Sequence, residues 1–324
     1  MIEDGAQVVA RVVRGGVVES VHRGHLVVLA PDGSVLLRHG DPDRAFFPRS
    51  SLKPVQAVAM LRSGLDLDGQ LLALACASHS GEREHLAGVC RILEGAGLGE
   101  AHLDNTPALP LDADAAAAWL CAGDGPTAIT QNCSGKHAAM LATCVAAGWD
   151  HVGYRDPGHP LQRAIRATVA ELTGDGDPAH VTVDGCGAPL FSCTPTGLAR
   201  AFRRIATAAP GTSEHRVADA VRAHPWWVGG TGRFVTRLVE AVPGIVAKDG
   251  AEGVFAAALP DGGALAVKIA DGAPRALPAV VTALVGELEV SVPAGVGEVP
   301  VLGHGAPVGQ VEAALPRTNG TLVR

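Results

Sequence analysis

Residues 25–38, HLVVLAPDGSVLLR, decide the fold class. Two runs rich in valine and leucine, His25 to Ala30 and Val35 to Arg38, flank Asp32-Gly33. An Asp-Gly pair between two such runs is typical of a β-hairpin turn. The run from Val8 to Val13 is also rich in β-formers, so we predict a β-sheet that begins near the start of the chain.

Helical patterns fill the middle of the chain, and strand patterns return near its end. We predict helices at 52–63, 83–95, 136–147, 160–173, 197–208, 214–223 and 232–241, strands at 245–248, 254–259 and 265–269, a helix at 276–289 and a last strand near 308–313. Strands at both ends with helices between them indicate an α/β fold whose largely antiparallel sheet is completed by both termini. We see no repeat and no linker, so we expect one domain over residues 1–324.

The composition excludes several classes of partner. The 324 residues carry a formal charge of −7, with only 3% aromatics and scattered Lys and Arg, so nucleic acid and anionic membrane are poor candidates. The first residues lack the regions of a signal peptide, and no apolar run approaches the ~18 residues of a membrane span. The seven cysteines show no disulfide spacing. We expect a cytoplasmic protein with reduced thiols.

A serine and a lysine open the first predicted helix. In Ser50-Ser51-Leu52-Lys53-Pro54, Lys53 follows Ser50 by one turn and lies on the same side. A neutral lysine could take the proton of a serine hydroxyl and make it a nucleophile, provided that burial or a nearby cation lowers the lysine pKa. The alternative is a helix N-cap serine followed by a solvated lysine.

A second serine, Ser78, follows the apolar run that ends near Cys76. There it could relay a proton between a base and a leaving group. On the local pattern alone, a role of Ser78 or Ser80 as the cap of the next helix is favoured. Glu82 and His85 have the i,i+3 spacing of metal ligands, but a solvated helix face explains them better.

Two cysteine motifs stand apart from the rest. Gln131-Asn-Cys-Ser-Gly-Lys-His137 places a cysteine, a lysine and a histidine at a helix N-terminus, which favours a thiolate. Cys186 lies between glycines in the tight loop Val183 to Pro189. Two thiols do not by themselves indicate zinc, so a packing role stays open for both. We predict packing roles for the remaining cysteines, Cys76, Cys90, Cys121, Cys144 and Cys193.

Two further segments could support such a site. Lys248, near the end of a predicted strand, would supply a cation if it faces Lys53; the alternative is a surface lysine at a hairpin. Gly229-Gly-Thr-Gly-Arg233 precedes a helix and could hold an anion, but no βαβ unit surrounds it, so it is not a nucleotide fingerprint.

The motifs together resemble one family. The segments Pro48 to Pro54, Cys76 to Ser80, Asn132 to His137 and Asp184 to Gly187 are similar, in this order, to the signature segments of the zinc-containing, serine-dependent L-asparaginase II family. The resemblance extends through Gly229–Arg233 and Lys248, from about residue 10 to 290. It implies a three-layer sandwich similar to serine β-lactamases and glutaminases, a homodimer, and L-asparagine as the small-molecule substrate.

The resemblance also assigns roles to single residues. It implies catalytic roles for Ser50, Lys53, Ser78 and Lys248, with Ser50 as nucleophile and Lys53 as its base. It implies Zn2+ ligands at Cys133, Lys136 and Cys186, and substrate contacts at Arg49, His137 and Asp184. An ammonium has no free lone pair, so Lys136 would have to lose its proton to bind zinc, and metal affinity should fall with acid.

The leading hypothesis is hydrolysis of the asparagine side-chain amide through an acyl-enzyme on Ser50, with zinc positioning the substrate. A glutaminase or a β-lactamase-like serine hydrolase on the same scaffold is the closest alternative. A non-catalytic zinc-binding regulatory protein and a metal-hydroxide hydrolase are the others. Asp249 departs from the Ser or Thr that β-lactamases carry after the equivalent lysine.

Overall fold

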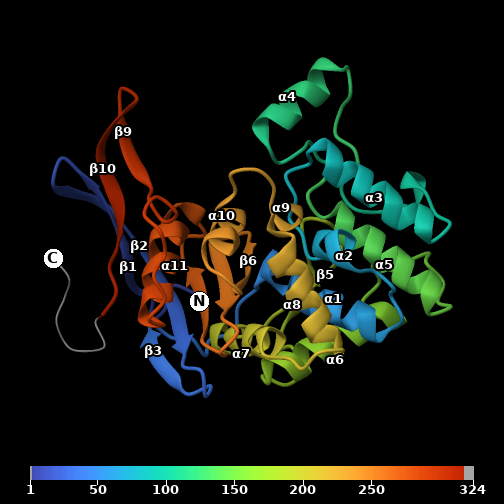
Figure 1. The fold of residues 1–324 in the computed structure, drawn as a ribbon, viewed down its shortest axis with the longest axis horizontal. Helices are drawn as coiled ribbons and strands as arrows, with labels where there is room; N and C mark the ends of the chain where they lie inside the picture. Colours follow the sequence, from blue (N-terminus) through green and yellow to red (C-terminus); the bar gives the residue numbers. More distant parts are fainter. Residues whose placement is uncertain (1, 317–324) are drawn as a thin grey trace. The chain divides into compact units, whose positions relative to one another are not determined.

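The predicted N-terminal hairpin is present in the computed structural model, which describes residues 2–316 (Figure 1). It joins β2 (Val17–Leu29) to β3 (Val35–His39), and β1 (Gln7–Arg14) pairs with β2. In the turn, Gly33 has a φ of +89°, and Asp32 Oδ1 accepts hydrogen bonds from the Ser34 amide (2.8 Å) and hydroxyl (2.6 Å). The Asp-Gly pair thus makes the turn through a side chain as well as through glycine's left-handed backbone.

The described chain folds into two compact units, each built from segments that are not consecutive. The first unit contains residues 2–51, 193–207 and 237–316. The second contains residues 52–192 and 208–236. The single domain predicted over residues 1–324 stays a prediction.

The first unit contains an eight-stranded antiparallel sheet. Its remaining strands are β6 (Val246–Gly250), β7 (Val254–Ala258), β8 (Ala264–Ile269), β9 (Pro300–Gly303) and β10 (Ala306–Ala313). The order is β6-β7-β8-β2-β1-β10-β9, and β3 pairs with β2. Because β1 pairs with β10, with Ala10 opposite Ala313, the two ends of the chain complete one sheet. The predicted α/β fold with a largely antiparallel sheet completed by both termini is confirmed.

Helices cover this sheet. Every residue of β7 and β8 is buried, which requires cover on both faces of these strands. α7 (Pro195–Ala206) contacts β2, β7 and β8, and α11 (Leu277–Glu287), which follows a 3-10 turn at Pro274–Ala276, contacts β8 and β10. α10 (Phe234–Ala241) precedes β6.

The second unit is mainly helical. Its helices are α1 (Lys53–Arg62), α2 (Gly69–Ala75), α3 (Arg83–Gly95), α4 (Ala113–Cys121), α5 (Ser134–Ala146), α6 (Pro160–Thr173), α8 (Ser213–Ala223) and α9 (Pro225–Val228), with a 3-10 turn at Glu100–His102 and a small hairpin of β4 (Val181–Val183) and β5 (Pro189–Phe191). α1 is the central helix: its residues from Lys53 to Leu61 are all buried, and it contacts α2, α5, α6 and α8. The lysine that begins α1 therefore lies in the core of this unit.

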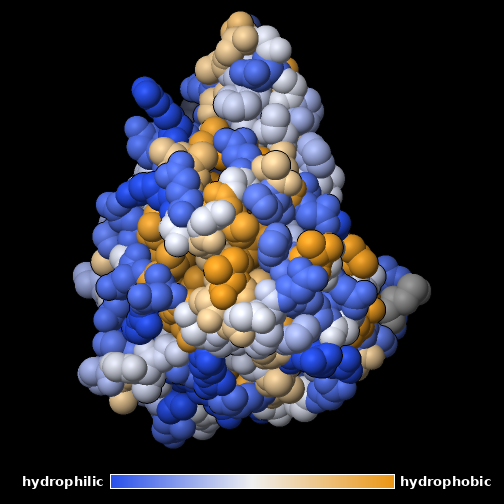
Figure 2. Space-filling view, turned by 90° about the vertical axis from the view of Figure 1, so that its right-hand side faces the viewer, coloured by the Kyte–Doolittle hydropathy of each residue, from blue (hydrophilic) through white to orange (hydrophobic). Residues whose placement is uncertain are grey.

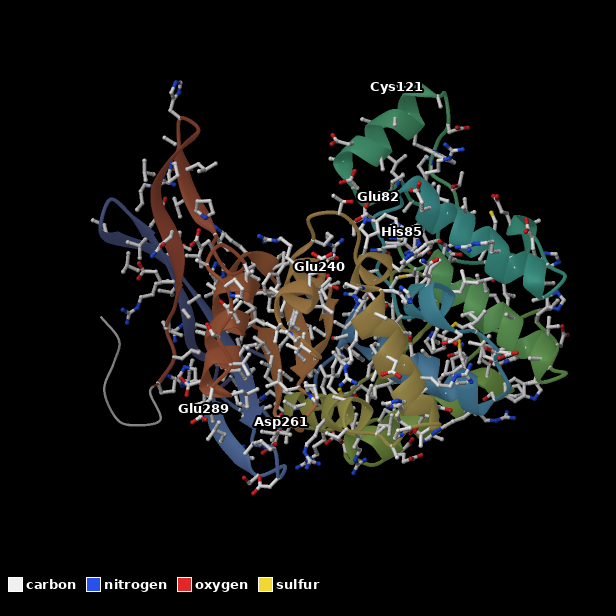
Figure 3. All side chains as sticks on the ribbon, viewed as in Figure 1. Glu82, His85, Cys121, Glu240, Asp261 and Glu289 are labelled. Atoms are coloured by element: carbon white, nitrogen blue, oxygen red, sulfur yellow. The ribbon has the colours of Figure 1, made fainter. Side chains whose placement is uncertain are left out.

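The elements that were not predicted include α4, the one-turn helix α9 and the short strands β5 and β9. None of the residues of α4 is buried, and Figure 3 places Cys121 at one end of this helix. The alanines at 115–118 favour a helix by propensity but give no pattern of apolar and polar faces. Because Cys121 is exposed, the packing role predicted for it is wrong.

Exposed apolar side chains of the second unit include Leu111, Leu120 and Val152. Figure 2 shows apolar residues gathered between hydrophilic ones on one face of the molecule. Among the described residues, no helix has the length and apolar character needed to cross a membrane.

Candidate functional site

The structure distinguishes the two neighbouring serines that precede α1. Both lie in the 3-10 turn Arg49–Leu52, but the Ser51 hydroxyl is buried and donates to the Pro48 carbonyl at 2.6 Å, whereas Ser50 is partly exposed. The N-cap of α1 is Leu52, with no side-chain cap, so the capping role considered for Ser50 is wrong. Ser50 is thus the serine of this pair whose side chain reaches the surface.

Arg49, the predicted substrate contact just before Ser50, has an unusual backbone. Its φ is +53°, which is strained for a residue with a side chain. Its guanidinium lies 3.9 Å from the carboxylate of Glu252, which also has a positive φ, +63°. Strain of this kind persists where the surrounding structure enforces it, and here it adjoins the predicted nucleophile.

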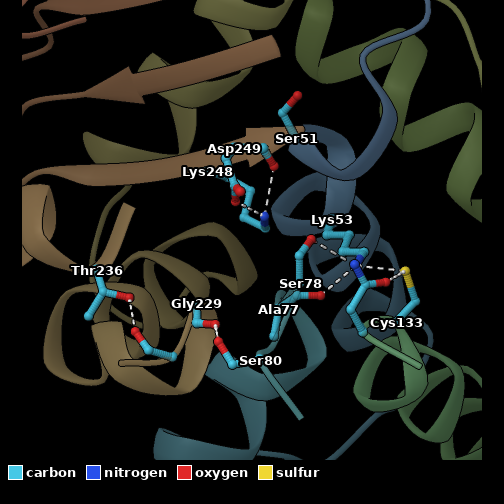
Figure 4. A network of polar contacts seen from close by, with 12 residues as sticks. Ser51, Lys53, Ala77, Ser78, Ser80, Cys133, Gly229, Thr236, Lys248 and Asp249 are labelled. Carbon is cyan, nitrogen blue, oxygen red and sulfur yellow. Dashed lines mark hydrogen bonds and ion pairs between the residues drawn. The ribbon is translucent and has the colours of Figure 1, made fainter. Parts of the chain in front are cut away.

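Lys53 is buried, with only 1% of its surface exposed, so the alternative of a solvated lysine is wrong. Its Nζ donates to the Ala77 carbonyl at 2.5 Å, to Ser78 Oγ at 3.2 Å and to Cys133 Sγ at 3.0 Å (Figure 4). The structure therefore brings a predicted base, a predicted proton relay and a predicted zinc ligand to one nitrogen atom. The bond to Cys133 was not predicted.

The three predicted zinc ligands lie together in the second unit. Cys133 immediately precedes α5, Lys136 lies in the first turn of α5, and Cys186 follows β4 in the tight loop. All three are buried, and Lys136 Nζ donates to Cys186 Sγ at 3.1 Å. Cys133 and Cys186 pack against each other and Ala188.

The charges of this group favour a thiolate. The pKa of Cys133 is held well below its usual value because the Cys186 thiol donates a hydrogen bond to it and the ammonium groups of Lys53 and Lys136 lie nearby, against the opposing effect of burial. That same hydrogen bond, with burial, raises the pKa of Cys186. Burial opposes the charge on Lys136, yet the neighbouring thiols raise its pKa. The pair of thiols thus holds a negative charge beside Lys53 and Lys136.

Zinc could bind this donor set only by displacing the proton of Lys136, whose pKa the neighbouring thiols raise. Two sulfur atoms and one nitrogen are ligand types that zinc binds, and a fourth position would remain for water or substrate. Within residues 2–316, no group of three His, Cys, Asp or Glu side chains could hold a metal, so a site on this chain would depend on Lys136.

His137, a predicted substrate contact, is a buried neutral ring. Burial holds its pKa well below the ordinary value, and the positive charges of Lys136 and Lys53 act in the same direction. Tyr154 Oη lies 2.7 Å from His137 Nδ1 and accepts a hydrogen bond from the Asp104 amide at 3.3 Å. We assign the Tyr154 hydroxyl as the donor and His137 Nδ1 as the acceptor, so that the neutral ring carries its hydrogen on Nε2.

Asp184, the third predicted substrate contact, shapes the loop that carries Cys186. Its amide donates to the Ala188 carbonyl at 2.9 Å, and its carboxylate accepts from the Gly185 amide at 2.8 Å. Gly187 has a φ of +86°, a left-handed backbone that side-chain-bearing residues rarely adopt. Asp184 therefore holds the tight loop, and its substrate role stays a prediction.

The alternatives weighed for the Ser78 segment fail. The N-cap of α3 is Glu82, and the Ser80 hydroxyl donates to the Gly229 carbonyl at 2.9 Å, so neither serine caps the helix. The solvated helix face is wrong for His85, which is buried and stacks on Trp226 with ring centroids 4.0 Å apart.

Lys248 lies in β6 of the first unit and is fully buried, so the surface-lysine alternative is wrong. Its Nζ donates to the Asp249 carbonyl at 2.7 Å and also contacts the Asp249 carboxylate. The aspartate noted as a departure from β-lactamases is therefore the counter-ion of this lysine. The proposed pairing of Lys248 with Ser78 stays a prediction.

Sequence reasoning missed several residues that support the site. Gln131 Oε1 accepts from the Cys133 amide at 2.9 Å and from Asn105 Nδ2 at 3.1 Å, which fixes the entry to α5. Tyr154 is the sole tyrosine of the sequence, which is the one signal that could have singled it out.

Comparisons with known proteins agree with the motifs. The sequence pattern of the family described as L-asparaginase II matches residues 10–313. A comparison with curated proteins finds no match.

Three solved structures are similar to this chain at low identity. A β-lactamase from Mycobacterium bovis is 16% identical, with a TM-score of 0.46, covering 82% of this chain and 95% of its own. A hydrolase with promiscuous acyltransferase activity is 12% identical, with a TM-score of 0.44 and coverage of 89% and 95%. A Bacillus glutaminase is 13% identical, with a TM-score of 0.37 and coverage of 76% and 83%. At these scores the likenesses assign no role to any residue of this chain.

Proposed function

Because the chain belongs to the L-asparaginase II family, we propose that it hydrolyses the side-chain amide of L-asparagine to L-aspartate and ammonia. Its membership of this family indicates a hydrolase that acts on amides and has a small-molecule substrate. The proposal adds asparagine as that substrate, Ser-Lys catalysis and zinc. The observation that carries it is the buried Lys53, which follows Ser50 by one turn and is hydrogen-bonded to both Ser78 and Cys133.

The proposed reaction is a double displacement. Lys53, as the free amine, takes the hydroxyl proton of Ser50, whose oxygen attacks the amide carbon. Backbone N–H groups near Ser50 stabilise the oxyanion. Ser78 passes the proton from Lys53 to the amide nitrogen, the C–N bond breaks and ammonia leaves. Water then attacks the aspartyl ester, and cleavage of the ester bond releases L-aspartate and restores the Ser50 hydroxyl.

Zinc is proposed to bind Cys133, Lys136 and Cys186. When bound, it would supply a Lewis-acidic contact that orients the substrate. Ser50 supplies the nucleophile, so the residues of the chain carry the proton transfers. The homodimer and the cytoplasmic location stay predictions from the resemblance.

The test compares two adjacent serines. Ser50→Ala should lower ammonia release from L-asparagine by on the order of 10³-fold or more, because no nucleophile remains. Ser51→Ala is the matched control, since the Ser51 hydroxyl donates to a backbone carbonyl, and it should stay within about tenfold of the unchanged protein. The Ser50 assignment fails if Ser50→Ala retains a tenth of the turnover. Parallel assays with L-glutamine and a chromogenic β-lactam separate the alternatives.

A further inference from the structure

The glycine-rich loop Gly229–Arg233 does hold an anion, and the anion is a side chain of this protein. The Thr231 amide donates to Glu82 Oε1 at 2.8 Å, and the Thr231 hydroxyl donates to Glu82 Oε2 at 2.8 Å. Gly230 and Gly232 have φ values of +113° and +70°, a left-handed backbone that glycine adopts without strain. Turns of this kind aim amide groups at an anion.

Further bonds join the same two stretches of chain, residues 78–82 and 228–231, which we call the clamp. The Ser78 amide donates to the Val228 carbonyl at 3.0 Å. The Ser80 hydroxyl donates to the Gly229 carbonyl at 2.9 Å (Figure 4). At Gly230 a Cβ would lie 2.1 Å from Ser80 Oγ, so the close approach itself requires a glycine. The clamp thus holds the backbone of Ser78 directly.

Glu82 is placed where its carboxylate would ordinarily serve a helix. It is the N-cap residue of α3, visible with His85 near that end of the helix in Figure 3, yet its side chain makes no cap hydrogen bond. The carboxylate goes to Thr231 instead. Trp226 Nε1 donates to the Thr231 hydroxyl at 2.9 Å, and the Trp226 ring stacks on His85. Thr231 therefore joins the Glu82 carboxylate to Trp226, and Trp226 stacks on the helix that Glu82 begins.

The clamp matters because the Ser78 segment has no regular structure of its own. α2 ends at Ala75 and α3 begins at Arg83, so residues 77–82 are neither helix nor strand. The clamp is one of the sets of bonds that hold them, beside the His79 amide, which donates to the Asn132 carbonyl at 3.1 Å, and Lys53, whose Nζ reaches Ser78 Oγ at 3.2 Å. A change in the loop would shift Ser78 relative to Lys53.

We propose that Glu82 is a positioning residue for Ser78: its carboxylate, held by Thr231, fixes the clamp so that the Ser78 hydroxyl stays in line to pass a proton to the leaving group. This inference rests on the proposed function, in which Ser78 is the proton relay. A displacement of about 1 Å at such a position can cost on the order of 10²-fold in rate.

The experiment compares two substrates that differ in leaving group, L-asparagine and the β-methyl ester of L-aspartate. An amide nitrogen must be protonated before it leaves, whereas methanol departure depends less on a relay. The ratio of kcat/KM for amide and ester therefore reports on Ser78, and a general loss of structure would lower both values equally. The variants are Glu82→Ala and Glu82→Gln, with Glu84→Ala as the matched control, an exposed glutamate two residues farther along.

We expect Glu82→Ala to lower kcat/KM for the amide by about 10²-fold and for the ester by at least about tenfold less. Glu82→Gln keeps one acceptor for the Thr231 amide, so its kcat/KM for the amide should lie between those of Glu82→Ala and the unchanged protein. Glu84→Ala should match the unchanged protein. If Glu82→Ala does not fold, the same ratio measured on Glu82→Gln decides.

An equal loss on both substrates, or no loss, overturns the role of Glu82. If the unchanged protein hydrolyses neither substrate, the proposed function fails and the inference fails with it. Activity of the unchanged protein on both substrates, with an amide-to-ester ratio that does not respond to Glu82, leaves the proposed function standing and removes the inference alone.

Discussion

Lys53 and Lys248 are both buried, yet their ammonium groups contact very different acceptors. Lys53, at the start of α1 in the second unit, donates to a carbonyl, a serine hydroxyl and a thiol that come from two other segments of the chain. Lys248, in β6 of the first unit, contacts the carbonyl and carboxylate of the residue that follows it. Lys53 thus contacts groups from other segments of the chain, and Lys248 contacts its neighbour Asp249.

This difference teaches that burial alone does not identify a catalytic lysine. Lys248 lies beside the carboxylate of Asp249, its counter-ion. Lys53 instead contacts Ser78 and Cys133, a proposed proton relay and a proposed zinc ligand. The variants below test whether this distinction holds, from the largest expected effect to the smallest.

The largest effect is expected for Lys53→Met, which keeps an unbranched stem and removes the amine. We expect kcat/KM for L-asparagine to fall by on the order of 10³-fold or more, because both the base for Ser50 and the donor to Ser78 are lost. Circular dichroism should show an intact fold. Activity within tenfold of the unchanged protein would end the distinction between the two lysines.

Lys248→Met should cost less, about 10²-fold, because the charge removed is already balanced by Asp249. The measurement is the same steady-state assay on the same preparation. A loss as large as that of Lys53→Met would show that Lys248 takes a direct part in proton transfer or substrate contact.

Cys186, the sulfur partner of Lys136, gives a third test. Cys186→Ala should abolish the zinc content found by elemental analysis and raise KM on the order of tenfold, with a smaller change in kcat. Cys144→Ala is the control, because Cys144 is also a buried free cysteine but was assigned no ligand role. Full zinc content in Cys186→Ala would place the metal elsewhere.

The smallest effect on activity is expected for Asp249→Asn, a loss of only a few-fold. The variant leaves the buried Lys248 ammonium without its carboxylate, so the free energy of unfolding should fall by about 1–3 kcal/mol. Urea unfolding measures it. The double variant Lys248→Met with Asp249→Asn should recover part of this loss, and equal stability of the single and double variants would argue against a coupled pair.

Some of the fold could be predicted to the residue. α6 spans Pro160–Thr173 as predicted, because a proline starts it and Gly174, with a φ of +71°, ends it. α4 could not be predicted, since its alanine-rich sequence has no apolar face to detect. Gly148 ends α5 with a φ of +67°, as its sequence position indicates.

The motifs of the site could be predicted from the sequence, but the contacts between their side chains could not. Ser78, Cys133 and Lys53 each belong to a recognisable segment, but no local pattern shows that one nitrogen contacts both others across 80 residues of sequence. The pattern around Glu82 even indicated a solvated face. Only the fold shows that Glu82 reaches Thr231, 149 residues farther along the chain.

The clamp also determines when, during synthesis and folding, the Ser78 segment can take its final conformation. Ser78 is synthesised long before Val228 and Gly229, whose carbonyls fix its backbone and that of Ser80. The chain meanwhile contributes residues 193–207 to the other unit and then returns to complete this one. Contacts so distant in sequence form late, because the loop they close must be ordered first. We expect a nascent chain that ends before residue 228 to contain Ser50, Lys53 and Ser78 but to lack a working proton relay.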